Sequence, residues 1–167
     1  MFSYELNLRK LDQKDLNFLL KLKISSQEFH HRTAIINETD QNLWLNSLNL
    51  DSHHPKSVYL VGYSEDEMDV GVFGLTNINY INRTAEILCD IIPELRNQGY
   101  GGKLLRSGIK FSKSILNLRK LGCEILENNN PCMKMLTKNG FSQEGIKVKQ
   151  VFKNGDYLDS IIFGLIL

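Results

Sequence analysis

The stretch of sequence that decides the fold is Pro93-Glu94-Leu95-Arg96-Asn97-Gln98-Gly99-Tyr100-Gly101-Gly102-Lys103-Leu104-Leu105. It follows a segment with strand character, residues 84–92, and opens a segment with helical spacing, residues 100–120. Three glycines within four residues let backbone N–H groups approach one point with no Cβ in the way. The helix start adds unpaired N–H groups and the positive end of the helix dipole. The stretch therefore predicts a cradle for a phosphate or pyrophosphate.

Two common phosphate-binding patterns do not fit this stretch. In the Walker pattern GxxxxGK[ST] the lysine stands further from the first glycine than Lys103 does here. The dinucleotide pattern GxGxxG needs a glycine where this chain has Leu104. What remains is Arg96-x-x-Gly99-x-Gly101. A glycine-rich turn alone is commonly just a tight turn, but its place between a strand and an amphipathic helix favours the phosphate interpretation.

The rest of the chain alternates between strand and helix patterns in the order β-α-α-β-β-β-α-β-α-β-β. Asp12 is the expected N-cap of the first helix, and Thr39 or Asp40 that of the second. Asn154-Gly155 predicts a two-residue hairpin turn near the C-terminus. The pattern predicts one mixed α/β (α+β) domain over residues 1–167, with much antiparallel pairing. The expected strands cover residues 4–11, 58–63, 70–77, 84–92, 123–126, 148–153 and 157–167, and the two later helices residues 100–120 and 132–138.

Composition excludes several classes of protein. The chain has 167 residues, enough for one ordinary domain, and its 20 basic and 19 acidic side chains give a net charge of +1. Such a chain has no global field to collect nucleic acid or an anionic membrane. Its three cysteines lack CxxC spacing, which argues against a disulfide framework or structural zinc site and favours a reducing compartment. The N-terminus lacks signal-peptide character and the longest apolar run, residues 161–167, is too short to span a bilayer, so we expect a cytoplasmic protein.

Two motifs resemble those of the GNAT superfamily of acyl-CoA-dependent N-acyltransferases. The residues Arg96-Asn97-Gln98-Gly99-Tyr100-Gly101 match its pyrophosphate loop. A second signature, Asn-x-x-Ser/Ala-x-x-x-Tyr-x-Lys-x-Gly-Phe, is matched downstream by Asn129, Cys132, Leu136, Lys138 and Gly140-Phe141. Within the superfamily, residues 78–86, 115–120 and 154–159 are most similar to spermidine acetyltransferases and the related ribosomal-protein N-terminal acetyltransferases. The resemblance implies a single domain with a mixed, mostly antiparallel central sheet flanked by helices.

The resemblance also implies a site for acetyl-CoA, used as a co-substrate with no metal. In the family the strand before the loop splays from its neighbour, and the pantetheine arm pairs with its exposed backbone. The helix face that carries Lys103 and Arg106 would attract the nucleotide's 3′-phosphate. The expected cofactor-binding residues are Ile91, Ile92, Arg96, Asn97, Gln98, Gly99, Tyr100, Gly101, Gly102, Lys103 and Asn129.

The implied reaction is direct attack of a neutral amine on the thioester, which needs a base, an oxyanion donor and an acid. Glu86 matches a strand carboxylate that is the base in some members, acting through water; the other interpretation pairs it with an arginine such as Arg83. The family's acid, a tyrosine, is replaced by Leu136. Tyr100 or a water could donate the proton instead, the thiolate could leave slowly unassisted, or the protein could bind acyl-CoA without turnover. Cys132 could donate weakly or simply be a packed residue.

The acceptor is less defined by the sequence. In this fold the region between the first two helices lines the acceptor pocket, here residues 25–37, so Phe29 and His31 are the expected substrate-binding residues. This region lacks the acidic cluster that a polyamine site wants, and His30, His31 and Arg32 would suit an acceptor with negative charge. A polyamine, an amino sugar and a protein N-terminus stay open. A non-catalytic acyl-CoA-binding module is the alternative function, and the apolar C-terminal strand suits a homodimer.

Overall fold

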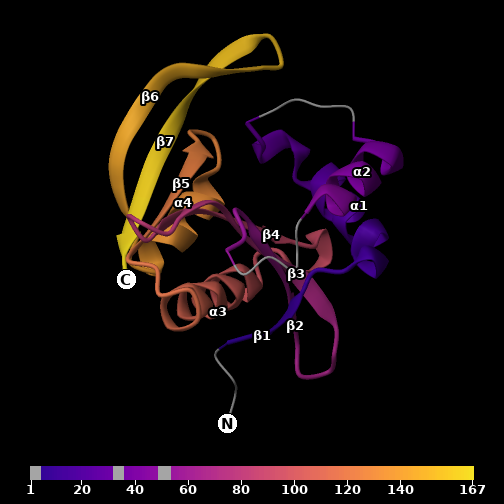
Figure 1. The fold of residues 1–167 in the computed structure, drawn as a ribbon. Helices are drawn as coiled ribbons and strands as arrows, with labels where there is room; N and C mark the ends of the chain where they lie inside the picture. The colour runs from indigo at the N-terminus through magenta and orange to yellow at the C-terminus, as the bar shows by residue number, and fades with distance from the viewer. Residues whose placement is uncertain (1–4, 32–35, 49–53) are drawn as a thin grey trace.

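A seven-stranded sheet forms the centre of the computed structural model, which describes residues 5–31, 36–48 and 54–167 (Figure 1). The strand order is β1-β2-β3-β4-β5-β7-β6, and every pairing is antiparallel except that of β4 with β5. This confirms the predicted mixed, mostly antiparallel domain. The strands are β1 (Asn7–Lys10), β2 (Val58–Tyr63), β3 (Asp69–Asn79), β4 (Thr84–Ile91), β5 (Lys120–Leu126), β6 (Ser142–Lys153) and β7 (Asp156–Ile166).

Helices cover both faces of the sheet. The helices are α1 (Leu16–Ser25), α2 (Glu38–Ser47), α3 (Tyr100–Ser114) and α4 (Asn130–Lys138), with short 3-10 turns η1 (Gln13–Asp15), η2 (Gln27–Phe29) and η3 (Pro93–Leu95). One core joins α1 and α2 to β2 and β3, through residues such as Leu22, Leu45 and Val61. The other joins α3 and α4 to the opposite face, around Phe73 and Leu104. In Figure 1 the paired strands β6 and β7 arch away from the rest of the sheet.

The sheet forks between β4 and β5. Their parallel pairing covers three registered pairs, from Thr84 with Lys120 to Glu86 with Gly122. Beyond Glu86 no registered pair joins β4 to β5 in the described chain, while β5 stays paired with β7 up to Leu126. The β5-facing edge of β4 after Glu86 therefore offers backbone groups to a bound molecule.

Local sequence signals explain most element boundaries. The Asp12 side chain accepts a hydrogen bond from Gln13 N–H and completes a capping box, as predicted. Asn154 and Gly155 have φ values of 54° and 89°, which the two-residue hairpin turn requires. The second helix begins earlier than predicted, because Asn37 caps it by accepting from Asp40 N–H at 2.8 Å.

Several predicted segments differ in length from those observed, most of all α3 and β6. Helix α3 ends at Ser114 rather than at residue 120, and Asn117 with φ 53° turns the chain into β5. Strand β6 begins at Ser142, earlier than predicted. Most of its residues are exposed and show no apolar alternation, so its first half has no strand pattern in the sequence. The acceptor segment contains the short turn η2, while Arg32 lies outside the described residues. In the described residues no helix is both long and apolar enough to cross a membrane.

Candidate active site

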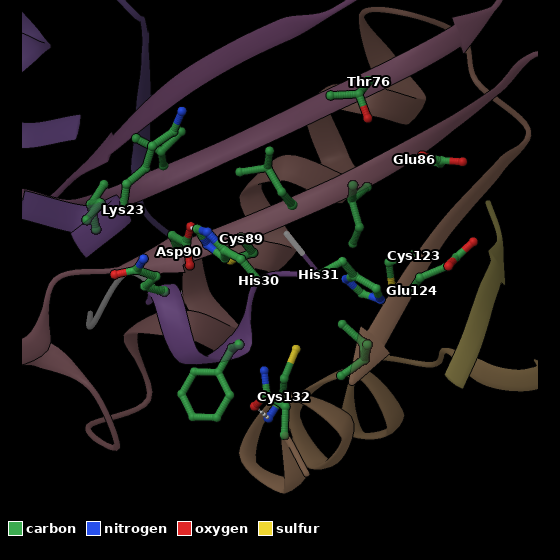
Figure 2. A pocket seen from close by; sticks show the side chains of 18 of the residues that line it. Lys23, His30, His31, Thr76, Glu86, Cys89, Asp90, Cys123, Glu124 and Cys132 are labelled. Atoms are coloured by element: carbon green, nitrogen blue, oxygen red, sulfur yellow. Dashed lines mark hydrogen bonds and ion pairs between the residues drawn. The ribbon is translucent and has the colours of Figure 1, made fainter. Parts of the chain in front are cut away.

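A cavity of about 940 Å³ lies at the fork of the sheet (Figure 2). Its walls come from β4 and β5, from α1 and η2 on one side, and from α4 and β6 on the others. Glu86, Phe29, His31 and Asn129, four of the residues singled out from sequence, all line it. The fold therefore joins the expected catalytic, acceptor and pantetheine residues in one space.

A second hollow, of about 650 Å³, lies where α3 and α4 approach each other. It contains the predicted Asn97, Gly99, Gly102 and Lys103. Its other charged lining residues are Arg106, Lys134 and Lys138, so the described lining carries four cations and no carboxylate. This charge suits the phosphates of a nucleotide. Lys134 was not predicted to belong to this site, and Lys138 was predicted only as part of the second motif, although the i, i+4 spacing of the two lysines places them on one helix face.

The glycine-rich turn forms the floor of this hollow. Gly99 has φ 85°, and a Cβ there would meet no atom within 4 Å, so the backbone conformation rather than space favours glycine. The first hydrogen bond at the helix start runs from Lys103 N–H to Gly99 O at 3.2 Å. The N–H groups of residues 100–102 therefore remain available at the positive end of α3, as a phosphate cradle requires. A Cβ on Gly101 would lie 2.9 Å from Met135 Sδ, which shows how closely α3 approaches α4.

Arg96 has a different place from that expected of a phosphate ligand. Its Nε donates to Ile91 O at 3.0 Å, and its two terminal nitrogens donate to Ser25 O at 3.0 Å and Ser25 Oγ at 2.8 Å. The guanidinium thus ties the end of β4 to the C-terminus of α1. This links the strand that borders the fork to the helix that covers the acceptor side.

The remaining predicted cofactor residues line neither of the two hollows. Ile91 is buried in the core between the sheet and α3, and Ile92 packs against the core between the sheet and helices α1 and α2. Gln98 donates to Glu94 O at 2.7 Å. The centre of the Tyr100 ring lies 5.0 Å from Lys103 Nζ, and Tyr100 lines neither of the two hollows. No contact in the described residues therefore supports Tyr100 as the proton donor. As ligands of the cofactor, all of these residues stay predictions.

Glu86 stands at the last registered pair before the fork. Its side chain is exposed, and Oε2 accepts a hydrogen bond from Asn77 Nδ2 at 2.9 Å. Arg83, the predicted alternative partner, instead donates to Asn117 O at 2.7 Å and Asn117 Oδ1 at 2.6 Å. Glu86 is therefore open to the cavity, and its role as the base stays a prediction.

Three thiols and Leu136 line the fork where the family's tyrosine is missing. Leu136 is 1% exposed and offers no proton. Burial raises the pKa of Cys132 to about 11 and that of Cys123 to about 12, and it raises the pKa of Cys89 as well. All three therefore remain neutral thiols near pH 7.

The acceptor side combines two histidines with carboxylates from the strands. His30 Nε2 lies 3.4 Å from Asp90 Oδ2, and Figure 2 shows both between β4 and η2. Across the cavity Glu124 accepts a hydrogen bond from Lys147, which is the main cause of the lowered pKa of that carboxyl. Lys153 Nζ donates to His30 O at 2.6 Å and so fixes η2 against β6.

The comparisons with known proteins agree with this geometry. The family model "Acetyltransferase (GNAT) domain" matches residues 5–142, and the chain belongs to this family. It is therefore an N-acetyltransferase that transfers an acetyl group from acetyl-CoA to an amine.

Individual relatives narrow the similarity. The spermidine N(1)-acetyltransferase of Vibrio cholerae serotype O1 is 29% identical over 159 residues, 93% of this chain and 89% of the relative. The enzyme of the same name from Escherichia coli strain K12 is 26% identical over 95% of this chain and 84% of its own. A solved structure of the V. cholerae spermidine N-acetyltransferase in complex with CoA and spermine has a TM-score of 0.89 and 25% identity, covering 98% of this chain and 96% of that one.

Proposed function

We propose that this enzyme acetylates a polyamine, and the observation that carries the proposal is the set of carboxylates in the main cavity. Glu86, Asp90 and Glu124 all line it, from the two strands of the fork. Carboxylates are the groups that bind the ammonium groups of a polyamine. Residues 25–37, where an acidic cluster would be expected, lack one, whereas the carboxylates of the cavity come from β4 and β5. The spermine bound to the V. cholerae enzyme supports the same acceptor class.

The remaining charges make Glu86 and Asp90 the principal ammonium ligands. Glu124 is already paired with Lys147, whereas Glu86 has no ion pair in the described residues. Asp90 lies 3.4 Å from His30 Nε2 and acts electrostatically on Lys23, whose Nζ lies 4.5 Å from the centre of the Trp44 ring. A chain of alternating ammonium and methylene groups would place its charges at the carboxylates and its apolar segments along Phe29. We propose that acetyl-CoA binds to the residues predicted for it. Its phosphates would lie in the second hollow, and its pantetheine arm would lie along β4, near Asn129.

The second candidate function is a non-catalytic acyl-CoA-binding module. Leu136 favours it, because this buried side chain stands where the family has its proton donor. A thiolate is nevertheless a good leaving group, and the cavity is wide enough for water to protonate it. The reaction therefore does not depend on a tyrosine at this position.

A coupled assay separates these functions. Purified protein, acetyl-CoA and a thiol-reactive dye are combined with spermidine, with a UDP-linked amino sugar, or with a peptide that has a free N-terminus. We expect CoA release with spermidine. An Asp90→Asn variant should raise the KM for spermidine about tenfold, the loss expected for one charge-assisted hydrogen bond, with the KM for acetyl-CoA unchanged.

Each other result has a defined meaning. Release with the sugar or the peptide but not with spermidine would overturn the polyamine proposal. No release with any amine, together with a thermal shift on adding acetyl-CoA, would favour the binding module.

We also propose a homodimer that uses the exposed edge of the sheet. The apolar C-terminal strand, β7, is paired on both sides by β5 and β6, so the edge strand on this side of the sheet is β6 instead. Exposed apolar side chains gather on this hairpin, among them Val148 at 72% and Tyr157 at 53%. Such an edge favours pairing with another chain. Light scattering should give about twice the mass of one chain, and a Val148→Lys variant should give the monomer.

We also propose, as the sequence predicts, that the protein is located in the cytoplasm.

A further inference from the structure

A hydrogen-bonded chain of three side chains fixes His31 at the wall of the main cavity. His31 Nε2 lies 2.9 Å from Ser160 Oγ, and Ser160 Oγ lies 3.1 Å from Glu124 Oε2. Ser160 is fully buried on β7, and Glu124 belongs to β5. The three residues are far apart in sequence, since His31 and Ser160 are separated by 129 positions. Figure 2 shows the His31 ring beside Glu124 in the pocket.

The donors and acceptors of this chain determine which nitrogen of His31 carries the proton. Glu124 is ionised, since the hydrogen bond from Lys147 lowers the pKa of its carboxyl, so it can only accept. The single hydroxyl hydrogen of Ser160 must therefore point to Glu124. Ser160 Oγ then accepts from His31 Nε2–H, and in a neutral imidazole this leaves the lone pair on Nδ1. No hydrogen bond joins Nδ1 to any residue in the described part of the chain.

The surroundings also keep the imidazole neutral. Burial is the largest influence and lowers the pKa of His31; Glu124 opposes this, while Lys147, Lys153 and His30 add to the lowering. These groups face His31 from β5, from β6 and from its own segment. Near neutral pH the ring is therefore an unprotonated base with one fixed tautomer.

We propose that His31 is the proton acceptor for the amine substrate, with Ser160 and Glu124 as the residues that position its ring. This inference rests on the proposed function, because it needs an ammonium group in the same cavity. His31 Nδ1 takes one proton from R–NH3⁺. The neutral amine then forms the C–N bond to the thioester carbon as the C–S bond breaks. The second amine proton passes to the CoA thiolate through water, and the imidazolium returns its proton to solvent.

This assignment differs from the expectation that Glu86 is the base. Glu86 is exposed and already accepts a hydrogen bond from Asn77. General-base catalysis is most effective when the pKa of the base is close to the working pH, and imidazole is the side chain whose ordinary pKa is nearest to neutral. Glu86 then binds a substrate ammonium group, in the same way as Asp90.

Kinetics of matched variants test the base. His31→Gln should lower kcat with spermidine by about 100-fold or more, with the KM for acetyl-CoA within about twofold of wild type. Added imidazole should restore part of that kcat. His54→Gln, at an exposed histidine outside the cavity, should leave kcat unchanged, and Glu86→Gln should act mainly on the KM for spermidine.

The pH profile tests the positioning residues. Ser160→Ala removes the link to Glu124 that stabilises the imidazolium, so the acidic limb of kcat should move to lower pH and the plateau should fall by about tenfold. A purely structural role for Ser160 would lower the plateau without moving the limb.

Nitrogen NMR on the wild-type protein provides a readout that does not depend on activity or on the folding of variants. We expect His31 to show the Nε2–H tautomer with an unprotonated Nδ1; the opposite tautomer would overturn the proposal. If wild type turns spermidine over but His31→Gln keeps kcat within about threefold, this inference fails and the proposed function stands. If wild type releases no CoA with spermidine, the proposed function itself fails.

Discussion

The two hollows of this enzyme are built in different ways. The cationic hollow takes its described lining from two short segments, residues 97–106 and 130–139, and depends largely on backbone geometry at the start of α3. The main cavity collects side chains from α1, η2, β4, β5, α4 and β6. The first is local and the second is assembled by the whole fold. A change in the first should therefore affect one ligand, whereas a change in the second can affect catalysis and the acceptor together.

The largest expected effect comes from Gly101→Glu in the first turn of α3, between the two glycines that line the cationic hollow. The new carboxylate would stand beside the available N–H groups of α3, and its Cβ would press on Met135 Sδ from 2.9 Å. We expect the KM for acetyl-CoA to rise by about 100-fold or more and the thermal shift by acetyl-CoA to disappear.

Gly101→Ala separates charge from space in this test. Alanine brings the same Cβ, and the flexible methionine side chain can move away from it. Gly101→Ala should therefore raise the KM for acetyl-CoA much less than Gly101→Glu does. Equal losses in the two variants would mean that packing against α4, not an anion cradle, explains this glycine.

The next largest effect is expected for Arg96→Met, which breaks the link from the glycine-rich loop and the end of β4 to the C-terminus of α1. The variant removes three hydrogen bonds, to Ile91 O and to both oxygens of Ser25. Loss of charged, partly buried hydrogen bonds should lower the free energy of unfolding by about 1.5–3 kcal/mol, measured by urea denaturation.

The kinetic result for Arg96→Met decides what the arginine does. Because its side chain holds β4 to α1, the KM values of both acetyl-CoA and the amine should rise. A rise for acetyl-CoA alone would return Arg96 to the predicted role of a phosphate ligand. Arg119→Met, at an exposed arginine, should change the free energy of unfolding by no more than about 0.5 kcal/mol.

The same contrast explains how much the sequence could predict. The turn at Gly99, the capping box at Asp12 and the hairpin at Asn154 follow from residues that are neighbours in sequence, and all three agree with the structure. The contact of His31 with Ser160 depends on how β7 packs beside β5, and no local pattern contains that information. Arg96 shows a related limit, since a motif fixes its position but not the direction of its side chain.

A smaller effect is expected for the double variant Lys134→Gln, Lys138→Gln. Both side chains are exposed, so each should contribute only about 0.5 kcal/mol to phosphate binding, and together they should raise the KM for acetyl-CoA about three- to tenfold. The KM for the amine should stay constant, and added salt should affect the variant less than wild type. Lys56→Gln, Lys113→Gln removes the same charge outside this hollow and should leave both KM values unchanged.

The smallest effect is expected for Cys132→Ala, which addresses the missing acid at Leu136. Burial raises the pKa of Cys132 to about 11, whereas an unperturbed thiol has a pKa of about 8.5. Proton transfer from Cys132 to the CoA thiolate would therefore run energetically uphill, and water in the open cavity is the better donor. We expect kcat to stay within about twofold of wild type across the neutral range. A tenfold loss of kcat at constant KM would instead identify Cys132 as the proton donor, and the acid would then come from the helix turn before Leu136, on the same face of α4.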